Sequence, residues 1–379
     1  MKPFDVYPLL DVEPVKANGC SLWDNNGIKY LDLYGGHAVI SIGHSHPHYI
    51  STIEAQLKKI GFYSNSVRIP IQVEFAKKLG EISGYPSYNL FLCNSGAEAN
   101  ENALKLASFH TGRKKIIAFT KSFHGRTSLA VAATDNPSII APVNETNNII
   151  FLPFNDELAL EKAMDETIAA VIIEGIQGVG GVKVASDSFL QKAKRLCEKV
   201  GAILILDEVQ SGYGRSGKFF SHQFSGIQPD LITVAKGMGN GFPIGGVLIS
   251  PKFQSKHHLL GTTFGGNHLA CAAAIAVVEV IKSENLLINA KAMGDYIISG
   301  LKKMSGIKEV RGRGLMIGID LEFPCDVFRN ELLFTHKIFT GSSSIKNTIR
   351  VLPPLSLSKD EADIFLHAFA ATMKKSLVK

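Results

Sequence analysis

Short apolar runs recur through the middle of the chain, and each is followed by a polar or glycine-rich turn and then by a segment of helical period. The runs that favour strands cover residues 90–93, 115–119, 149–153, 169–174, 202–207, 231–234 and 246–250. The segments of helical period between them include 97–110, 156–165 and 187–200. This alternation is typical of a mostly parallel sheet with helices on both faces, so we expect an α/β fold.

The rhythm changes after about residue 252, which suggests a second domain. Two helical segments and two strand regions then follow, at 269–281, 290–304, 311–321 and 348–357. Near the N-terminus, residues 27–33 predict part of a strand pair. We therefore expect a large domain of residues 48–252 and a smaller α+β domain formed by residues 1–47 and 253–379.

Composition and charge exclude several classes of protein. The chain has 379 residues, and its 40 Lys and Arg against 34 Asp and Glu give a net charge of +6. The basic residues are scattered, so nucleic-acid binding is not indicated. The five cysteines are odd in number and far apart, so neither a disulfide framework nor a zinc site of paired thiolates is predicted. Because no apolar run approaches the roughly 18 residues of a membrane span, and the start does not resemble a signal peptide, we expect a cytoplasmic protein without membrane attachment.

Two motifs that suggest a ligand are weakened by their context. Residues 212–218 approach both a dinucleotide fingerprint and a P-loop, and a nucleotide-binding ATPase is the alternative that they leave open. However, no acidic residue ends the next strand, and Phe219 stands where a P-loop needs a hydroxyl. His44, His46 and His48 alternate, but no Cys or acidic ligand lies at useful spacing, so we predict no metal site.

Three features at predicted strand ends point to a shared site. Ser95, with Glu98 three residues later, predicts a capped helix start, where Gly96 and the free N–H groups of the first turn favour an anion. Asp207 ends one apolar strand and Lys236 ends the next. Each feature alone has a structural explanation, as a helix cap or as an ion pair. Together they are the three groups that pyridoxal phosphate needs, namely a phosphate cradle, a partner for the pyridine nitrogen and a lysine for the aldehyde.

The chain resembles the class III pyridoxal-phosphate aminotransferases of fold type I, and within them the acetylornithine and succinylornithine aminotransferases. The matching segments include NSGAEANENALKLA, FHGRT, LDEVQSGYGRSGKFF, AKGMGNGFPIGG, GTTFGGNHLAC and IRVLPPL, in order along almost the whole chain. The resemblance implies transfer of the δ-amino group of an N-acetyl- or N-succinylornithine to 2-oxoglutarate, as in arginine biosynthesis. An ornithine or 4-aminobutyrate aminotransferase is the alternative within the class, and a non-catalytic carrier of the cofactor is an alternative outside it.

The resemblance also implies which residues contact the cofactor ring. Lys236 would bind the aldehyde and then carry protons as base and acid. Asp207 would hold the pyridine nitrogen protonated, and Gln210 would lie near the phenolic oxygen. Val209 and Phe123 would pack on opposite faces of the ring.

The phosphate of the cofactor would be held by two chains. Ser95, Gly96 and Ala97 would surround it at the helix start, with backbone N–H groups as donors. Thr263 resembles a hydroxyl that reaches this phosphate from the neighbouring subunit. The resemblance therefore implies a homodimer with shared active sites.

Two arginines would recognise the substrates. Arg126 would bind the α-carboxylate of the donor, with Thr262 beside it, and Arg350 would bind that of 2-oxoglutarate or glutamate. The family segment Glu-Pro-x-Gln-Gly-Glu departs here, because Val179 replaces the final glutamate that normally pairs with the arginine at 350. We hypothesise that an uncovered Arg350 favours a donor with an extra carboxylate, such as N-succinylornithine. Glu174, from the same segment, is expected near the cofactor behind its direct contacts.

Overall fold

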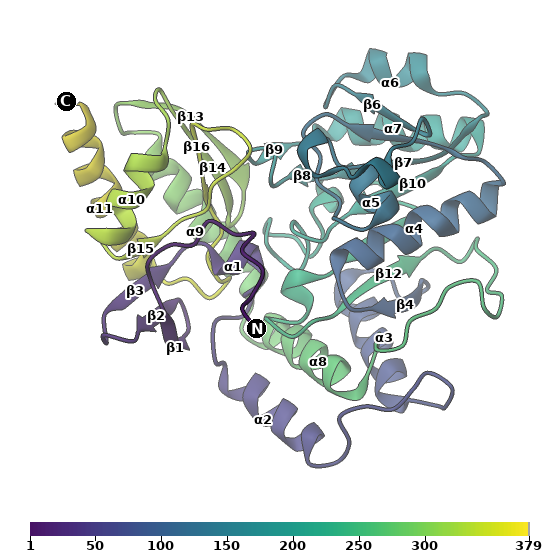
Figure 1. The fold of residues 1–379 in the computed structure, drawn as a ribbon, viewed down its shortest axis with the longest axis horizontal. Helices are drawn as coiled ribbons and strands as arrows, with labels where there is room; N and C mark the ends of the chain where they lie inside the picture. The colour runs from purple at the N-terminus through teal and green to yellow at the C-terminus, as the bar shows by residue number, and fades with distance from the viewer. Residues whose placement is uncertain (378–379) are drawn as a thin grey trace.

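The computed structural model describes residues 1–377 and is built around a seven-stranded sheet (Figure 1). In spatial order the strands are β4 (Asn89–Cys93), β12 (Gly245–Ile249), β11 (Leu231–Val234), β10 (Ile203–Asp207), β7 (Ile168–Glu174), β5 (Lys115–Phe119) and β6 (Ile149–Leu152). Strand β12 runs antiparallel to both of its neighbours, and the other adjacent strands are parallel. The predicted α/β fold is confirmed, and each of these strands ends within one residue of its predicted bounds.

Helices cover both faces of this sheet, which explains why its central strands are apolar throughout. Ala170 and Ile172 of β7 pack in a cluster with α4 (Gly96–Thr111). Val171 and Ile173 point to the other face and pack in a cluster with α7 (Asp187–Val200). All four side chains are fully buried, so neither face of β7 tolerates a polar residue. The shorter helices on this part are α5 (Ser128–Ala132) and α6 (Glu157–Ala163), with a small hairpin of β8 (Ile176–Gln177) and β9 (Lys183–Val184).

A second group of elements joins the two ends of the chain. One sheet contains β1 (Pro14–Asn18), β2 (Ser21–Asp24), β3 (Lys29–Asp32) and β15 (Ile338–Phe339), and another contains β13 (Ile307–Arg313), β14 (Met316–Leu321) and β16 (Thr348–Val351). The helices beside them are α9 (Leu286–Leu301), α10 (Asp326–Phe334) and α11 (Lys359–Leu377). Because β3 pairs with β15, the N-terminal strands lie next to the C-terminal part (Figure 1).

Helix α8 (His268–Ser283) connects the two groups and packs against α2 (Pro47–Leu57) and α3 (Pro70–Ser83). Helix α9 begins at Leu286, four residues before its predicted start, because Asn285 adopts a left-handed conformation that ends the preceding turn. Short helical turns occur at α1 (Gly35–Ala38), Pro137–Ile139, Pro142–Asn144, Ser221–Phe224 and Lys236–Met238. Within residues 1–377, no helix combines the length and the apolar character that crossing a membrane requires.

Candidate functional site

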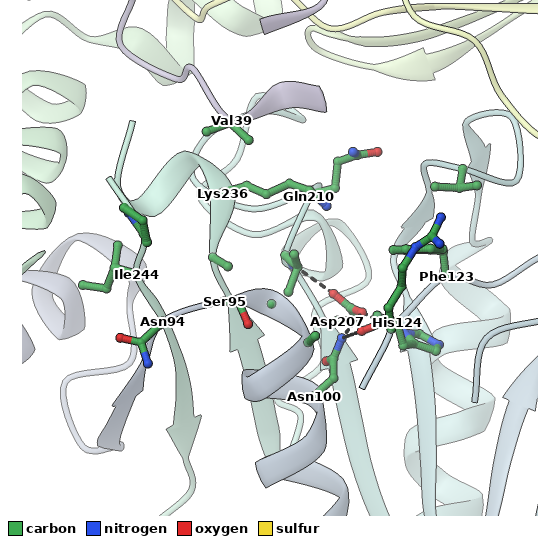
Figure 2. A pocket seen from close by; sticks show the side chains of 18 of the residues that line it. Val39, Asn94, Ser95, Asn100, Phe123, His124, Asp207, Gln210, Lys236 and Ile244 are labelled. Carbon is green, nitrogen blue, oxygen red and sulfur yellow. Dashed lines mark hydrogen bonds and ion pairs between the residues drawn. The ribbon is translucent and has the colours of Figure 1, made fainter. Parts of the chain in front are cut away.

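The end of strand β10 carries a buried carboxylate that is held from several sides. Oδ2 of Asp207 lies 2.7 Å from Nδ1 of His124 and accepts a 2.7 Å hydrogen bond from Nδ2 of Asn100. Oδ1 accepts a 3.0 Å hydrogen bond from the backbone N–H of Val209. Figure 2 shows Asp207, His124 and Asn100 gathered at one side of a cavity. The carboxylate is therefore fixed in one orientation.

The contact with Asp207 favours the charged form of His124. Burial alone would lower the pKa of the imidazole, but the hydrogen bond and charge of Asp207 outweigh burial and raise it. The other ring nitrogen, Nε2, is buried and has no hydrogen-bond partner among residues 1–377. Neither His124 nor Asn100 is predicted from the sequence above. The signals that could have found them are the position of His124 directly after Phe123 and that of Asn100 one helical turn after Gly96.

The cavity beside Asp207 has a volume of about 400 Å³. Among the predicted site residues, those that line it are Ser95, Gly96, Ala97, Phe123, Arg126, Glu174, Asp207, Val209, Gln210 and Lys236. Val179, the residue that replaces the family glutamate, lines it as well. The carboxyl ends of neighbouring strands β10 and β11 bring Asp207 and Lys236 to the same cavity, as expected for a sheet of this type (Figure 2).

Lys236 has the properties of a reactive amine. Burial lowers the pKa of Lys236, and the charges of Asp207 and Glu174 offset this only in part. Its backbone φ of 46° is in the left-handed region, which non-glycine residues rarely adopt and which is common at functional sites. The ion pair of Asp207 within the described chain is made with His124, so a lysine–aspartate bridge does not occupy the amine.

The start of helix α4 forms a narrow backbone surface at the cavity. Ser95 is the N-cap, and its Oγ accepts a hydrogen bond of 3.2 Å from the backbone N–H of Glu98, as predicted. The Glu98 carboxylate caps the N–H of Asn94 instead of that of Ser95. A Cβ atom on Gly96 would lie only 2.6 Å from Cγ1 of Val209, so only glycine leaves room here. Free N–H groups at the first turn thus face a space that suits an anion.

Glu174 ends strand β7 and ties two loops to the cavity. Its carboxyl oxygens accept hydrogen bonds of 3.0 Å from the N–H of Phe123 and of 3.2 Å from the N–H of Gly178. Burial, together with the negative charge of Asp207, raises the pKa of Glu174 to about 7. The side chain therefore takes up a proton near neutral pH.

The predicted substrate residues do not all reach the cavity in one chain. Arg126 lines it and is exposed to solvent. Arg350 is buried behind it, and its Nη1 donates to Oε1 of Gln210 over 3.3 Å. Thr262 accepts hydrogen bonds from Asn94 and Gly265, and the exposed Thr263 also lies outside the cavity lining.

The glycine-rich loop at 212–218 and the three alternating histidines have structural roles. Arg215, in the loop at 212–218, is fully buried and donates to the carbonyl oxygens of Leu315 and Ile40, so this loop holds separate segments together. The alternating histidines do not converge. Each places Nε2 against a different carboxylate, in the pairs His44–Asp32, His46–Glu284 and His48–Glu279.

Comparison with known proteins identifies the family of the chain. The sequence profile of the family described as aminotransferase class-III matches residues 5–373. The chain belongs to the class-III aminotransferases. Its relatives include acetylornithine aminotransferases of Archaeoglobus fulgidus, 43% identical over 92% of each chain, and of Bacillus subtilis, 40% identical over 94% of each chain.

Solved structures of aminotransferases have the same fold. The ornithine aminotransferase of Toxoplasma gondii ME49 superposes with a TM-score of 0.91 at 28% identity, over 98% of this chain and 93% of that chain. The acetylornithine aminotransferase of Elizabethkingia anophelis gives 0.85 at 28% identity, over 98% and 96%. Another Toxoplasma gondii structure is described with partial occupancy of PLP at the active site. The chain is thus a fold type I, pyridoxal-phosphate-dependent aminotransferase.

The residues of this class-III aminotransferase fit that cofactor. An amine with a lowered pKa, a fixed carboxylate and a helix start with room only for glycine surround one cavity. These match the aldehyde, the pyridine nitrogen and the phosphate of pyridoxal phosphate, respectively.

Proposed function

We propose that this aminotransferase moves the δ-amino group of an N2-acylornithine, N-acetyl- or N-succinylornithine, to 2-oxoglutarate. The products are the acylglutamate semialdehyde and glutamate, as in arginine biosynthesis. The observation that carries the proposal is that eight relatives named acetylornithine aminotransferase share 37–43% identity with the chain over 92–99% of its length. Identity to the solved structures does not separate the two donors, because the ornithine aminotransferases share 26–28% and the acetylornithine aminotransferase of Elizabethkingia anophelis shares 28%.

The cofactor is held by residues on three sides of the cavity. Lys236 would bind the aldehyde, Asp207 the pyridine nitrogen, and the first turn of α4 at Ser95, Gly96 and Ala97 the phosphate. Two apolar side chains, Val209 and Phe123, would cover the faces of the ring, and Gln210 would lie near the phenolic oxygen. When bound, pyridoxal phosphate supplies an electron sink that stabilises negative charge on a substrate carbon.

The chain's own groups hold and move the protons. Because burial lowers the pKa of Lys236, its Nζ can accept the proton that leaves the δ-carbon of the donor. The same nitrogen returns a proton when 2-oxoglutarate becomes glutamate. Asp207 would keep a proton on the pyridine nitrogen, and His124 behind it fixes the position of the carboxylate. Glu174 positions the backbone of Phe123 and does not act on the substrate.

Substrate carboxylates are bound by arginines. Arg126, exposed at the cavity, binds the α-carboxylate of the donor beside Thr262, and Arg350 binds that of the acceptor. Since both substrates use one site in turn, the kinetics are ping-pong.

A second copy of the chain completes the site. Thr263 of one subunit reaches the phosphate bound by its partner. In support, Phe264 next to it is 60% exposed and contacts the exposed Phe62, with ring centroids 5.3 Å apart, which suits burial in a homodimer. We also propose that residues 48–252 form the cofactor-binding domain, that residues 1–47 and 253–379 form the smaller domain, and that the enzyme acts in the cytoplasm.

The visible spectrum of the purified holoenzyme tests the function. Without 2-oxoglutarate, an N-acylornithine should bleach the yellow colour of the bound cofactor, and the Lys236→Ala variant should not respond in the same way. Bleaching by ornithine or 4-aminobutyrate alone would contradict the acylornithine proposal. Protein that stays colourless after addition of pyridoxal phosphate would contradict the assignment of Lys236.

A further inference from the structure

The backbone that leads into Arg126 is fixed against the start of helix α4. The N–H of His124 donates to Oγ1 of Thr134 over 2.9 Å. Gly125 has a φ of 143°, and a Cβ atom there would lie only 2.7 Å from Cβ of Ala97, in the first turn of α4. Because no larger residue fits in this contact, the chain reaches Arg126 along one path.

The backbone that follows Arg126 is held by Glu101, a carboxylate on helix α4. Its Oε2 accepts hydrogen bonds of 2.9 Å from the hydroxyl of Thr127 and from the N–H groups of Leu129 and Ala130. Its Oε1 lies 3.0 Å from the same N–H of Leu129. Both carboxylate oxygens are therefore used within the four residues after the arginine.

These N–H groups belong to the first turn of helix α5, which packs against α4 (Figure 1). Thr127 occupies the N-cap position of α5, but its hydroxyl bonds Glu101 instead of the helix. The carboxylate from α4 thus takes the place of the cap, and its negative charge suits the positive end of the helix dipole. The start of α5 is already filled by this side chain.

Glu101 and Arg126 do not neutralise each other. Within residues 1–377, the ion pairs made by arginines use Arg311 and Arg313. Arg126 is exposed and lines the cavity, whereas Glu101 is not among the described residues of that lining. The guanidinium is therefore left for a ligand in the cavity, while the carboxylate holds the backbone that carries it.

The position of this backbone decides whether the guanidinium can bind a carboxylate well. Two parallel N–H···O bonds form only when the planar groups face each other correctly. A displacement of about 1 Å in a binding group can lower the rate on the order of a hundredfold. The anchors before and after Arg126 supply this precision, and Glu101 is the anchor that carries a charge.

We propose that Glu101 is a positioning residue, which holds Arg126 in place for the α-carboxylate of the donor by fixing the first turn of α5. This inference rests on the proposed function, because that function gives Arg126 its substrate group. Glu101 itself touches neither the donor nor the cofactor.

The test uses two amine donors that differ in one group. The first is the N-acylornithine that the enzyme uses best, acetyl or succinyl, and the second is the matching N-acyl-1,4-diaminobutane, which lacks the α-carboxylate. The rate at which each donor bleaches the bound cofactor without 2-oxoglutarate gives the second-order rate constant of the donor half-reaction.

Glu101→Gln replaces one acceptor oxygen by an amide donor and removes the charge. It should lower the rate constant for the N-acylornithine about tenfold and change that for the N-acyl-1,4-diaminobutane less than about twofold. The affinity of the cofactor-free variant for pyridoxal phosphate, measured by equilibrium titration, should also change less than about twofold.

A double variant tests whether Glu101 acts through Arg126. Arg126→Ala alone should remove the preference for the donor with the α-carboxylate. Adding Glu101→Gln to Arg126→Ala should then cause no further loss, because effects that act through one group are not additive.

Asp156 offers a matched control at another short helix. Its Oδ1 accepts hydrogen bonds of 3.1 Å and 2.9 Å from the N–H groups of Leu158 and Ala159 at the start of α6, and it is not among the described residues that line the cavity. Asp156→Asn makes the same change from carboxylate to amide, and it should leave the rate constants for both donors unaffected.

The outcomes separate this inference from the function on which it rests. No loss for the N-acylornithine in Glu101→Gln, an equal loss for both donors, or a further loss in the double variant would refute the positioning role while the acylornithine function stands. If Arg126→Ala kept the preference for the carboxylated donor, the assignment of Arg126 and this inference would both be wrong. Bleaching by ornithine or 4-aminobutyrate, with neither acylornithine active, would refute the proposed function itself.

Discussion

Oδ2 of Asp207 lies 2.7 Å from Nδ1 of His124, and both side chains are buried at the cavity. Nε2, on the far side of the His124 ring, has no hydrogen-bond partner in the described chain. Among the described side chains, Asp207 alone therefore orients this histidine. Asn100 adds a second restraint, since its Oδ1 accepts a 2.7 Å hydrogen bond from Thr233 on strand β11. The carboxylate is thereby coupled to strand β11, which ends two residues before Lys236.

Substitutions of Asp207 and of His124 should separate an effect on proton transfer from an effect on the position of the carboxylate. Asp207→Asn should retain the cofactor but slow proton removal from the donor on the order of a hundredfold or more, because the charge that keeps the pyridine nitrogen protonated is lost. His124→Gln should slow it about tenfold and shift the absorbance maximum of the bound cofactor. Single-turnover rates with the donor and visible spectra measure both effects.

A matched control is Asn102→Ala, because Asn102 lies on the same helix and bonds only the carbonyl oxygen of Glu98 among its described contacts. If His124→Gln changed the thermal midpoint but neither the spectrum nor the rate, its role would be structural.

The raised pKa of Glu174 should make stability depend on pH. The pKa is about 7 in the folded protein and 4.5 in the unfolded chain, so the unfolded state ionises first as pH rises. The contribution of Glu174 is therefore fully favourable below about pH 4.5, falls as pH rises to about 7, and is constant above that. We expect a loss of about 3 kcal/mol over this window in the cofactor-free protein.

Chemical denaturation of the cofactor-free protein between pH 4.5 and 8 measures this effect. The difference in unfolding free energy between the unaltered protein and Glu174→Gln should change with pH in the direction given. A difference that stays flat across the window would show that Glu174 does not take up a proton.

The sequence predicted the large sheet well for a physical reason. Its central strands are buried on both faces, so each appears as a continuous apolar run that turn residues interrupt. The residues at the ends of β10 and β11 could be placed for the same reason, since parallel strands end at one edge. Contacts between segments that are far apart along the chain leave no such pattern in the sequence. His124 and Asp207 are 83 positions apart, yet their side chains are paired.

A second buried network next to the site should contribute to stability. Glu208 is fully buried and accepts hydrogen bonds from Ser211, over 2.6 Å, and from Ser221, over 2.8 Å. It also lies 2.8 Å from Nδ1 of His222, whose Nε2 contacts the hydroxyl of Tyr85. Burial opposes ionisation of Glu208, but the hydrogen bond and charge of His222 and the serine donors lower its pKa.

Glu208→Gln should therefore reduce the unfolding free energy at pH 7 by about 3–5 kcal/mol, the usual cost of breaking a buried ion pair from one side. The folded pKa is below the unfolded one, so this contribution is present above about pH 4.5 and is lost as pH falls further. Urea unfolding at pH 7 and pH 4 checks both points. Glu161→Gln removes an exposed ion pair with Lys192 and should have no measurable effect. An equal loss in the two variants would contradict the role of burial.

The close approach of Gly96 to Val209 can be tested with a second substitution that should restore cofactor binding. A Cβ added at Gly96 would lie 2.6 Å from Cγ1 and 3.1 Å from Cγ2 of Val209, so Gly96→Ala must displace either the helix start or the valine. We expect Gly96→Ala to weaken the binding of pyridoxal phosphate by about tenfold or more, because both elements face the cofactor. Val209→Ala removes the two methyl groups that clash, so the double variant should recover most of the affinity. Equilibrium titration of the cofactor-free protein with pyridoxal phosphate measures all four proteins. If the double variant bound no better than Gly96→Ala, the steric explanation would be wrong, and the glycine would be needed for its backbone alone.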